Sequence, residues 1–192
     1  MRNPFRSERL LYRAIKDTPE DAAFVHSVQD DPEAYALSNM ALLRPETTKS
    51  SAEWKKHLDE ERLIAVIICI APLSNPAEKD PVPIGIVSLA KPCAGLEHHR
   101  NSSIAIDVIE AHRGKGYGSE AIRWMVDWGF RTAGLHRIGI QCFSYNPGAA
   151  RLYERLGFVP EGRRREEVWF NGAWHDVLQF SVLEHEWKER QR

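Results

Sequence analysis

The stretch Arg113-Gly114-Lys115-Gly116-Tyr117-Gly118 follows an alternating apolar run with Ile104, Ile106 and Val108, and it precedes a strongly helical segment at 119–133. A glycine-rich turn between a strand and a helix presents unpaired backbone N–H groups at the positive end of the helix dipole, and this geometry binds phosphate. Glycine suits such a turn because the backbone can require positive φ, and because a side chain would keep a phosphate away from the N–H groups. The stretch therefore predicts a phosphate-binding turn, with an ordinary strand-to-helix turn as the alternative.

The spacing of these glycines differs from the two common nucleotide-binding motifs. The chain contains neither Gly-x-x-x-x-Gly-Lys-Ser/Thr nor Gly-x-Gly-x-x-Gly at this point, and its pattern is Arg-x-x-Gly-x-Gly. A phosphate-bearing ligand other than a typical P-loop or Rossmann nucleotide is therefore expected, and a nucleotide-binding fold of a different kind stays open.

Length and composition indicate one globular domain over residues 1–192. With 43% hydrophobic residues, 28% charged residues and a formal net charge of −1, the chain can bury a core but lacks the bulk positive charge of many nucleic-acid proteins. Its longest apolar run, 63–71, is far shorter than the ~20 residues of a membrane span. Residues 1–8 have no apolar segment behind them, so we expect no secretory signal. The expectation is a soluble cytoplasmic protein that binds neither nucleic acid nor membrane.

The cysteines and histidines give no sign of a disulfide framework or a metal site. Cys69, Cys93 and Cys142 are odd in number and widely spaced, which is typical of free thiols in a reducing compartment. The pair His98-His99 lacks partners at metal-ligand spacing and is interpreted as part of a polar loop. We therefore expect no metal cofactor.

The first half of the chain alternates apolar runs with helix signals. Asp17-Thr18-Pro19-Glu20 combines a capping residue with a proline for the first helical turn, so a helix is expected to run to about Gln29 and to end before Pro32. A polar connection is expected to follow it. The other expected elements are strands at 10–15, 63–70, 84–90 and 103–109, a helix at 50–62 and an extended proline-rich loop at 71–83.

The second half predicts a strand–helix–strand unit and a hairpin. The segment 119–133 carries an apolar stripe of 3.6-residue period and ends at Gly134. Asn171-Gly172 is a strong hairpin signal between expected strands at 166–170 and 173–183. A strand is expected at 137–143 and a helix at 146–157. The fold class is therefore α/β, with a mixed, mostly antiparallel sheet of about seven strands and four helices on both faces.

Two motifs in this arrangement resemble those of the GCN5-related N-acetyltransferase (GNAT) superfamily. The first is Gln/Arg-x-x-Gly-x-Gly/Ala, matched by Arg113, Gly116 and Gly118. The second is Asn-x-x-Ala-x-x-x-Tyr-x-x-x-Gly-Phe, matched by Asn146, Ala149, Tyr153, Gly157 and Phe158. The likeness is specific over 103–187, and the tail from Glu161 to Val177 is most similar to the branch that contains ribosomal-protein alanine acetyltransferases and spermidine acetyltransferases.

The resemblance implies that acetyl-CoA is the acetyl donor. Its pyrophosphate is expected on the turn, with Arg113 and Lys115 as neighbouring charges, and its pantetheine in a slot where the fourth and fifth strands splay apart. The backbone N–H of Val108 is expected to polarise the thioester carbonyl, while the side chains of Ile106 and Val108 pack in the core. The implied cofactor-binding residues are Ile106, Asp107, Val108, Arg113, Gly114, Lys115, Gly116, Tyr117, Gly118, Ser119, Asn146 and Tyr153.

Two residues of the second motif have both a functional and a structural interpretation. Tyr153 is expected to be a general acid that returns a proton to the CoA thiolate, although its place beside Leu152 and Leu156 also suits a core aromatic residue. Asn146 is expected to contact the cofactor arm, although its position already explains it as a helix N-cap.

The general base is not identified by the motifs. Some ribosomal-alanine enzymes carry a glutamate five residues before the asparagine, and this chain has Gln141 there. The candidates are Asp107, Glu110, His112, Glu167, His175 and Asp176, or solvent. Asp176, on the expected hairpin, is also the candidate for contact with the acceptor.

Three further segments bear on the acceptor. Residues 35–48 occupy the stretch that commonly covers the acceptor in this fold. The run Arg163–Arg165 is either a solvated charged strand or a binder of cofactor phosphates or of a substrate carboxylate. Trp169 and Trp174 flank the hairpin turn, where they either line an acceptor pocket or cap the core.

The resemblance implies direct acetyl transfer to a primary amine in one ternary complex, where proximity supplies much of the rate. Cys142 is expected to be a small packing residue, so a ping-pong mechanism is disfavoured. The acceptor is a protein N-terminus, a polyamine or another small amine, and the protein is a monomer or a homodimer. A non-catalytic acyl-CoA-binding sensor or scaffold remains the alternative.

Overall fold

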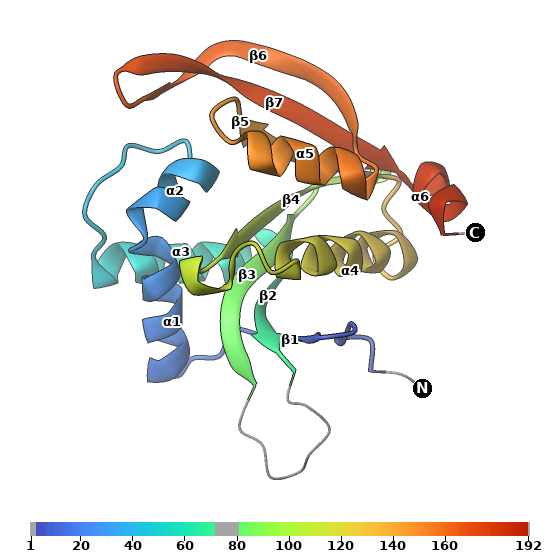
Figure 1. Cartoon of the computed structure of the whole chain (residues 1–192). Helices are drawn as coiled ribbons and strands as arrows, with labels where there is room; N and C mark the ends of the chain where they lie inside the picture. The colour runs from blue at the N-terminus through green and yellow to red at the C-terminus, as the bar shows by residue number, and fades with distance from the viewer. Residues whose placement is uncertain (1–2, 72–80, 192) are drawn as a thin grey trace.

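A computed structural model describes residues 3–71 and 81–191, which form one seven-stranded sheet flanked by helices (Figure 1). The strand order is β1-β2-β3-β4-β5-β7-β6, and every neighbouring pair is antiparallel except β4 and β5, which are parallel. The strands are β1 (Leu10–Arg13), β2 (Arg62–Ile70), β3 (Val82–Ala90), β4 (Asn101–Val108), β5 (Arg137–Phe143), β6 (Val159–Phe170) and β7 (Ala173–Leu183). The predicted mixed, mostly antiparallel sheet is confirmed.

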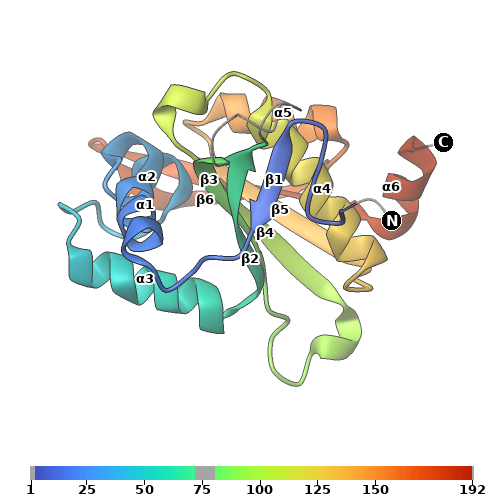
Figure 2. The same ribbon diagram turned by 90° about the horizontal axis from the view of Figure 1, so that it is seen from below.

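Helices cover both faces of this sheet. The helices are α1 (Pro19–Gln29), α2 (Pro32–Ser38), α3 (Thr48–Glu60), α4 (Tyr117–Arg131), α5 (Pro147–Leu156) and α6 (Glu184–Arg190), with short 3-10 turns η1 (Glu97–His99) and η2 (Glu110–His112). Figure 2 shows α1, α2 and α3 on one side of the sheet and α4 and α5 on the other. The larger core cluster lies under α4 and α5, around Met125 and Ile138, and a smaller cluster around Val25 and Ile67 lies under α1 and α3.

Helix starts follow from local capping. The side chain of Thr18 accepts a hydrogen bond from the Asp21 N–H at the start of α1, and Pro19 fills the first helical position. The same pairing of a capping residue with proline begins α2, where the Asp31 carboxylate accepts from the Ala34 N–H over 2.9 Å. A capping side chain followed by proline therefore begins both helices.

The four predicted helices are present, and two short ones were missed. The sequence interpretation took Pro32 as the end of a helix and expected a polar connection, whereas Pro32 is the first residue of α2. Helix α6 follows β7 directly and buries Trp187, whose indole N–H donates to Asp127 on α4 over 2.7 Å. Tertiary packing fixes this last helix, since seven residues are too few for a stable helix by themselves.

Several predicted boundaries also shift. The first strand ends at Arg13 rather than at residue 15, and α4 begins at Tyr117, two residues earlier than expected. The strand before the Asn171-Gly172 turn is much longer than predicted, because Val159–Phe170 pairs with β7 along most of its length despite a bulge after Arg164. Of the expected loop at 71–83, residues 72–80 lie outside the described part of the chain, and Val82 and Pro83 belong to β3.

The sheet opens between its two parallel strands. β4 and β5 are paired only at three positions, where Asn101, Ser102 and Ser103 face 137–139, and the rest of β4 has no partner on that side. The predicted splay of the fourth and fifth strands is thus confirmed. It leaves a V-shaped gap in the middle of the sheet, next to the glycine-rich turn that follows β4.

Candidate active site

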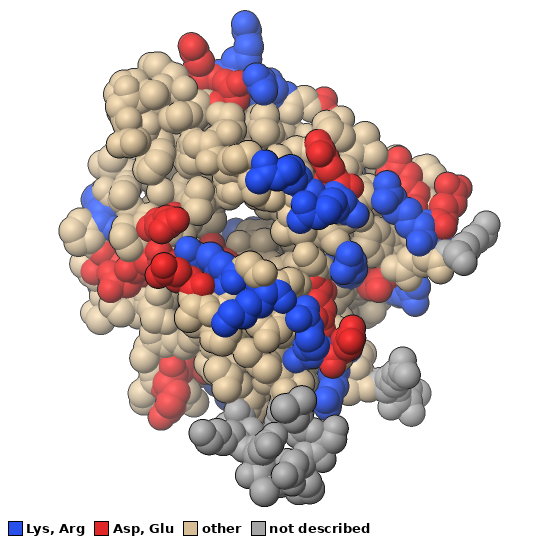
Figure 3. Space-filling view, in the orientation of Figure 1, with Lys and Arg blue, Asp and Glu red and all other residues tan. Residues whose placement is uncertain are grey.

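A cavity of about 910 Å³ occupies this gap. Its volume lies within the range of ligand-binding sites. Side chains from both faces of the sheet line it: Ile104 and Phe180 come from the face under α4 and α5, while Arg62 and Gln141 come from the other. Figure 3, in the same view as Figure 1, shows a hollow near the centre of the molecule, with Lys and Arg side chains gathered along part of its border. The cavity therefore passes through the sheet and is open to ligands from either face.

Ten of the predicted cofactor residues line this cavity. They are Ile106, Asp107, Val108, Arg113, Gly114, Gly116, Gly118, Ser119, Asn146 and Tyr153. Two motifs that are separated by about thirty residues in the sequence are therefore brought to one site.

The glycine-rich turn presents free amides to the cavity. Gly114 and Gly116 have φ of +72° and +82°, and Gly116 caps α4 without any side-chain hydrogen bond. Within the described ranges, the N–H groups of residues 114–119 have no hydrogen-bond acceptor. A Cβ built on Gly114 or Gly118 would meet no atom within 4 Å, so space lies directly over these amides. Unpaired N–H groups at a helix start with open space above them fit the diphosphate of CoA.

Two side chains of the turn face away from the cavity. The Lys115 ammonium donates to the Ala111 carbonyl over 2.7 Å, and the Tyr117 ring lies under the Arg9 guanidinium at 4.7 Å from its centroid. Neither residue lines the cavity. Lys115 and Tyr117 therefore offer their backbone rather than their side chains to a ligand.

Arg113 connects the turn to the neighbouring elements. Its Nε donates to the Val108 carbonyl oxygen over 2.8 Å, and its Nη2 contacts the Asp31 carboxylate over 2.5 Å. The sequence interpretation treated Arg113 as a charge beside the phosphates, whereas two of its nitrogens are bonded within the protein. Arg113 thus fixes both the end of β4 and the start of α2.

The register of β4 determines which backbone groups face the gap. The Ile109 N–H donates to the Ile84 carbonyl over 2.9 Å, and residue pairs along an antiparallel ladder alternate between bonded and unbonded. The N–H groups of Ile106 and Val108 therefore point away from β3 and toward the gap. The backbone groups of Asp107 point toward β3, so this residue offers only its side chain to the cavity.

The carboxyl of Asp107 is the candidate base in the cavity wall. Burial raises its pKa above the ordinary aspartate range, and the Ser38 hydroxyl and the Arg113 charge oppose that rise. A carboxylate destabilised by desolvation binds a proton more readily. Asp107 is therefore the one carboxyl among the base candidates that lines the cavity.

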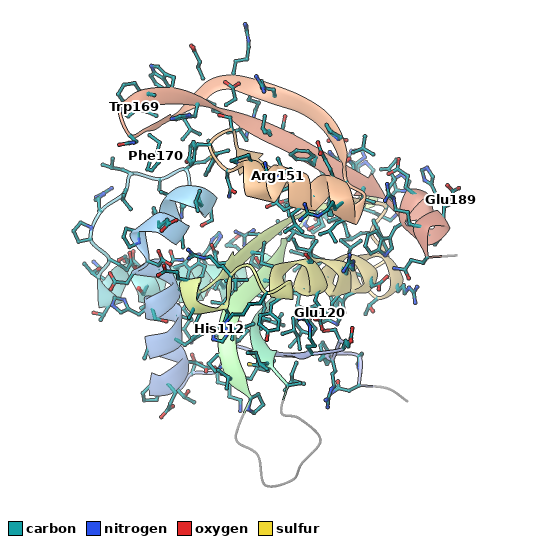
Figure 4. The ribbon with its side chains drawn as sticks, viewed as in Figure 1. His112, Glu120, Arg151, Trp169, Phe170 and Glu189 are labelled. Atoms are coloured by element: carbon teal, nitrogen blue, oxygen red, sulfur yellow. The ribbon has the colours of Figure 1, made fainter. Side chains whose placement is uncertain are left out.

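The remaining base candidates are mostly elsewhere. His112 lines the cavity beside the turn, where Figure 4 labels it, and its Nδ1 is buried without a hydrogen-bond partner. Glu110, Glu167 and His175 do not line the cavity. Asp176, the predicted acceptor contact, does not line it either: its carboxylate accepts from the Glu166 N–H over 2.8 Å and pairs with Arg163 over 3.1 Å. Asp176 stabilises the bulge of the hairpin.

Tyr153 is both a core residue and a cavity residue. It is 7% exposed, and its ring packs edge-on against Phe180 with centroids 5.7 Å apart. Burial raises its pKa well above the usual tyrosine value, with the charges of Cys142 and Asp107 adding to the rise. The phenol is therefore protonated at neutral pH, as a proton donor must be.

Asn146 and Cys142 agree with their structural interpretations. The Asn146 side-chain oxygen accepts from the Ala149 N–H over 3.1 Å, so the predicted N-cap of α5 is confirmed, and the residue also lines the cavity. Cys142 is buried in the larger core cluster, where burial raises the pKa of its thiol to about 11. Such a thiol is a poor nucleophile near neutral pH.

The sequence interpretation missed several polar residues on the face opposite α4 and α5. Arg62 was assigned to the end of a helix, whereas it begins β2 and lines the cavity. Gln179 lines it as well, as do Arg137 and Glu161, which form an ion pair. The alternation of polar residues along 137–141 was the one available signal for this wall.

Helix α2 lies across the same side of the gap. Its residues Ala34, Leu37 and Ser38 line the cavity, and of the predicted acceptor-covering stretch 35–48 only Leu37 and Ser38 do so. It is held at one end by the Asp31–Arg113 contact and at the other by the Tyr145 hydroxyl, which donates to the Ala36 carbonyl over 2.7 Å. These contacts fix α2 as one wall of the site.

The hairpin residues predicted to bear on the acceptor lie outside the cavity. Trp169 and Trp174 pack edge-on against each other and are 60% and 57% exposed, so they neither line the pocket nor cap the core. In Figure 4, Trp169 and Phe170 lie near the tip of the hairpin, and Phe170 stacks on Tyr145 with centroids 4.8 Å apart. The run Arg163–Arg165 is exposed on β6, as expected of a solvated strand.

Among residues 3–71 and 81–191, no group of three or more His, Cys, Asp or Glu side chains is arranged to hold a metal ion. In the same described ranges, no helix combines the length and the apolar character needed to cross a bilayer.

Comparisons with known proteins agree on one family. A family model described as "Acetyltransferase (GNAT) domain" matches residues 9–159. Spermidine N(1)-acetyltransferase of Vibrio cholerae is 35% identical over 92 residues, which are 48% of this chain and only 53% of that relative. An uncharacterized N-acetyltransferase of the SPbeta prophage of Bacillus subtilis is 28% identical over 187 residues, covering 94% of this chain and 93% of the relative. The solved structure of the Vibrio cholerae spermidine N-acetyltransferase with CoA and spermine matches with a TM-score of 0.77 at 26% identity, covering 94% of this chain and 98% of that one.

Proposed function

The chain belongs to the acetyltransferase (GNAT) domain family and is an acyltransferase, and on this premise we propose that it transfers an acetyl group from acetyl-CoA to a primary amine by direct transfer in a ternary complex. One observation carries the proposal: the free amides of the turn, the Val108 N–H, the Asp107 carboxyl and the Tyr153 phenol all belong to a single cavity. Together they supply a diphosphate site, an oxyanion donor, a base and an acid.

The turn and the splayed strand orient the donor. The amides of residues 114–119 bind the diphosphate, and the Ile106 and Val108 backbone groups that face the gap hydrogen-bond the pantetheine arm. Acetyl-CoA supplies the acetyl group as a thioester. The Val108 N–H stabilises the negative charge that develops on the thioester oxygen, a contact whose loss typically costs about 3 kcal/mol of activation free energy.

Asp107 prepares the amine. A protonated amine has no lone pair for attack, so a proton must leave before or during transfer. The Asp107 carboxylate accepts this proton directly or through a water, because its raised pKa makes it a stronger base than an exposed aspartate. The position that is Gln141 in this chain then needs no carboxylate.

Tyr153 completes the proton balance. Its phenol donates a proton to the sulfur of CoA as the bond between carbon and sulfur breaks, and the resulting phenolate takes the second proton that the amine nitrogen loses as the amide forms. The products are CoA as its thiol and an N-acetyl amide, with the Tyr153 phenol restored. Because its pKa is raised by burial, the phenol holds its proton until a thiolate forms beside it. Cys142 takes no part, since its thiol is buried and protonated.

The acceptor is a small-molecule amine or a protein N-terminus, and a relative that acts on spermidine supports the former. We place the activity in the cytoplasm, which is supported by three free cysteines, two of them buried.

The test combines binding with activity. Isothermal titration calorimetry with CoA should show one site per chain, while ATP and NAD should neither bind nor shift the thermal unfolding midpoint. A thiol-release assay with acetyl-CoA and a library of amines should detect at least one acceptor. Absence of CoA binding would refute the proposal, and CoA binding without acetylation of any amine or peptide would favour a non-catalytic sensor.

A further inference from the structure

A second, smaller cavity adjoins the main one on the face of the sheet under α1 and α3. Its volume is about 90 Å³, and Ser38, Arg62, Ala105 and Asp107 line both cavities. The small cavity continues past Asp107 toward α3, away from the glycine-rich turn that serves the donor. A ligand that reaches Asp107 from this side is therefore the acceptor.

Arg62 is the only lysine or arginine among the residues that line the small cavity. Its Nε is fully buried and has no hydrogen-bond partner, and no ion pair joins its guanidinium to a carboxylate within the described ranges. Burial alone lowers the pKa of Arg62, which agrees with the absence of a neighbouring acid. A buried guanidinium nitrogen without a partner is costly unless a ligand supplies the acceptor.

Three other arginines line the main cavity, and one of them, Arg155, belongs to α5 on the opposite face of the sheet and does not line the small cavity. The other two are already bonded within the protein. Arg113 is bonded to Val108 and Asp31, and Arg137 is paired with Glu161. Arg62 is therefore the residue whose charge is available on the acceptor side.

The sheet register sets Arg62 and Asp107 apart along one face. Arg62 pairs with Ala90 on β3, and Asp107 pairs with Ile86, four residues away on the same strand. At about 3.4 Å per residue they are roughly 14 Å apart along the strands, and because β2 and β4 flank β3 they are also roughly 10 Å apart across the sheet. The long arginine side chain spans part of that distance. One molecule can then place its amine at Asp107 and a negative group at Arg62.

Building on the proposed function, we propose that the acceptor is an amine that also carries an anionic group, a carboxylate or a phosphate, which Arg62 binds at the far end of the small cavity. A guanidinium recognises either oxyanion through paired N–H donors. The same charge disfavours a polycation, whose second ammonium would face Arg62 rather than an acid.

The experiment compares matched acceptors with the full-length protein. The probes are glycine, 4-aminobutyrate, 6-aminohexanoate, lysine and glutamate, each beside its neutral carboxamide, together with 3-aminopropyl phosphate and spermidine. The kcat/KM for each amine is measured by thiol release at saturating acetyl-CoA. We expect at least one acid to exceed its carboxamide by roughly 10- to 100-fold, the range for a hydrogen bond to a charged group. Comparison of 3-aminopropyl phosphate with the amino acids shows whether a phosphate or a carboxylate is preferred.

Arg62→Gln tests the residue itself. This variant should remove the preference for the acid while the rate with the matching carboxamide stays within about threefold of wild type. Arg62→Lys keeps the positive charge but loses the paired N–H donors of the guanidinium, so it should retain part of the preference for the acid. Arg123→Gln, an exposed position of α4 outside both cavities, is the matched control and should change neither rate. A merely structural Arg62 would instead lower the unfolding midpoint and both rates together.

The outcomes separate this inference from the proposed function. If CoA does not bind and no amine is acetylated, the proposed function fails. If amines are acetylated but spermidine or the carboxamides equal the anionic acceptors, only the role of Arg62 fails. An equal loss of activity toward acid and carboxamide in Arg62→Gln would overturn the inference in the same way.

Discussion

The guanidinium of Arg113 donates from Nε to the carbonyl oxygen of Val108 over 2.8 Å. Val108 is also the residue whose N–H faces the gap, so a motif residue outside the strand fixes the peptide next to the proposed oxyanion donor. The same guanidinium contacts Asp31 at the start of α2. One side chain therefore ties the end of β4 to the start of α2, a helix that forms one wall of the cavity.

This relationship gives a prediction for Arg113→Gln. The variant should lower kcat by about 10²-fold, because a displacement of about 1 Å in a reacting group has this effect, while the Kd for CoA changes little. Asp31→Asn keeps the cap on α2 but removes the charge, and it should show a smaller loss of the same kind. Steady-state kinetics and calorimetry separate the two effects. A large loss of CoA affinity in Arg113→Gln would show instead that the guanidinium contacts phosphate.

The diphosphate site predicts the effect of Gly118→Asp. A carboxylate in the first turn of α4 favours the helix by about 0.3–1 kcal/mol, so the free energy of unfolding should not fall. The same charge repels a diphosphate, and the Kd for CoA should rise by at least about 100-fold. Urea unfolding and calorimetry measure the two quantities. Gly162→Asp, on exposed β6, is the control, and equal CoA affinity in both variants would contradict the site.

The position of Tyr153 predicts a selective loss of turnover in Tyr153→Phe. The ring contacts with Phe180 remain, so stability and CoA affinity should be nearly unchanged. Turnover should fall by about tenfold, less than the 10²–10⁴-fold typical of acid–base catalysis, because a thiolate is a fair leaving group. Unaltered kcat at saturating substrates would remove Tyr153 from the mechanism.

The raised pKa of Asp107 predicts opposite effects on activity and stability. Asp107→Asn should lower kcat by about 10²–10⁴-fold and remove the rise of kcat/KM with pH that follows deprotonation of the carboxyl. A pKa raised by folding means that the ionised carboxylate destabilises the protein above that pKa, and that protonation at lower pH relieves this cost. Asp107→Asn should thus be more stable than wild type at pH 7, with the difference vanishing below the ordinary aspartate pKa. A less stable variant at pH 7 would contradict this account.

The contact between Arg13 and Asp21 predicts acid sensitivity far from the cavity. Asp21 is 3% exposed and accepts from Arg13 over 2.6 and 2.7 Å, and hydrogen bonds from Arg13 lower its pKa. Its contribution to stability is full above the unfolded-state pKa and is lost as the pH falls through the lower folded-state value. Asp21→Asn should cost about 1–3 kcal/mol of unfolding free energy at pH 7 and less at pH 3. Urea titrations at both pH values measure this, and an equal cost at both would exclude the charge as its source.

Much of the fold could be predicted because local signals and packing agree. The cap and proline at Thr18-Pro19, the stripe of α4 and the Asn171-Gly172 turn each fixed an element close to its observed place. Pro32 was misinterpreted because a proline is found both just after the end of a helix and at the start of one. The capping hydrogen bond of the Asp31 side chain shows that Pro32 begins α2. Helix α6 was missed because it depends on the hydrogen bond from Trp187 to Asp127, two residues that are sixty positions apart in the sequence. No local sequence pattern shows such a contact.

The candidate site was predictable where the backbone acts and where a motif marks a side chain such as Tyr153. The glycine spacing indicated the free amides of the turn, because glycine is required by the conformation itself. The destinations of side chains such as Arg113 and Asp176 depend on partners far away in the sequence, Asp31 for the first and a bulge at Glu166 for the second. Arg62 was missed because it stands at the junction of a helix and a strand, where its direction follows from the strand register alone.

A cavity that opens on both faces of a sheet has a kinetic consequence. Under the proposed function, the donor enters beside the turn that precedes α4 and the acceptor enters under α2 from the opposite face, so neither would block the route of the other. Product inhibition should reflect these two separate entry routes. Free CoA should compete with acetyl-CoA alone, and the acetylated product should compete with the amine alone. Either product can then depart first, and the order of release is set by affinity rather than by obstruction.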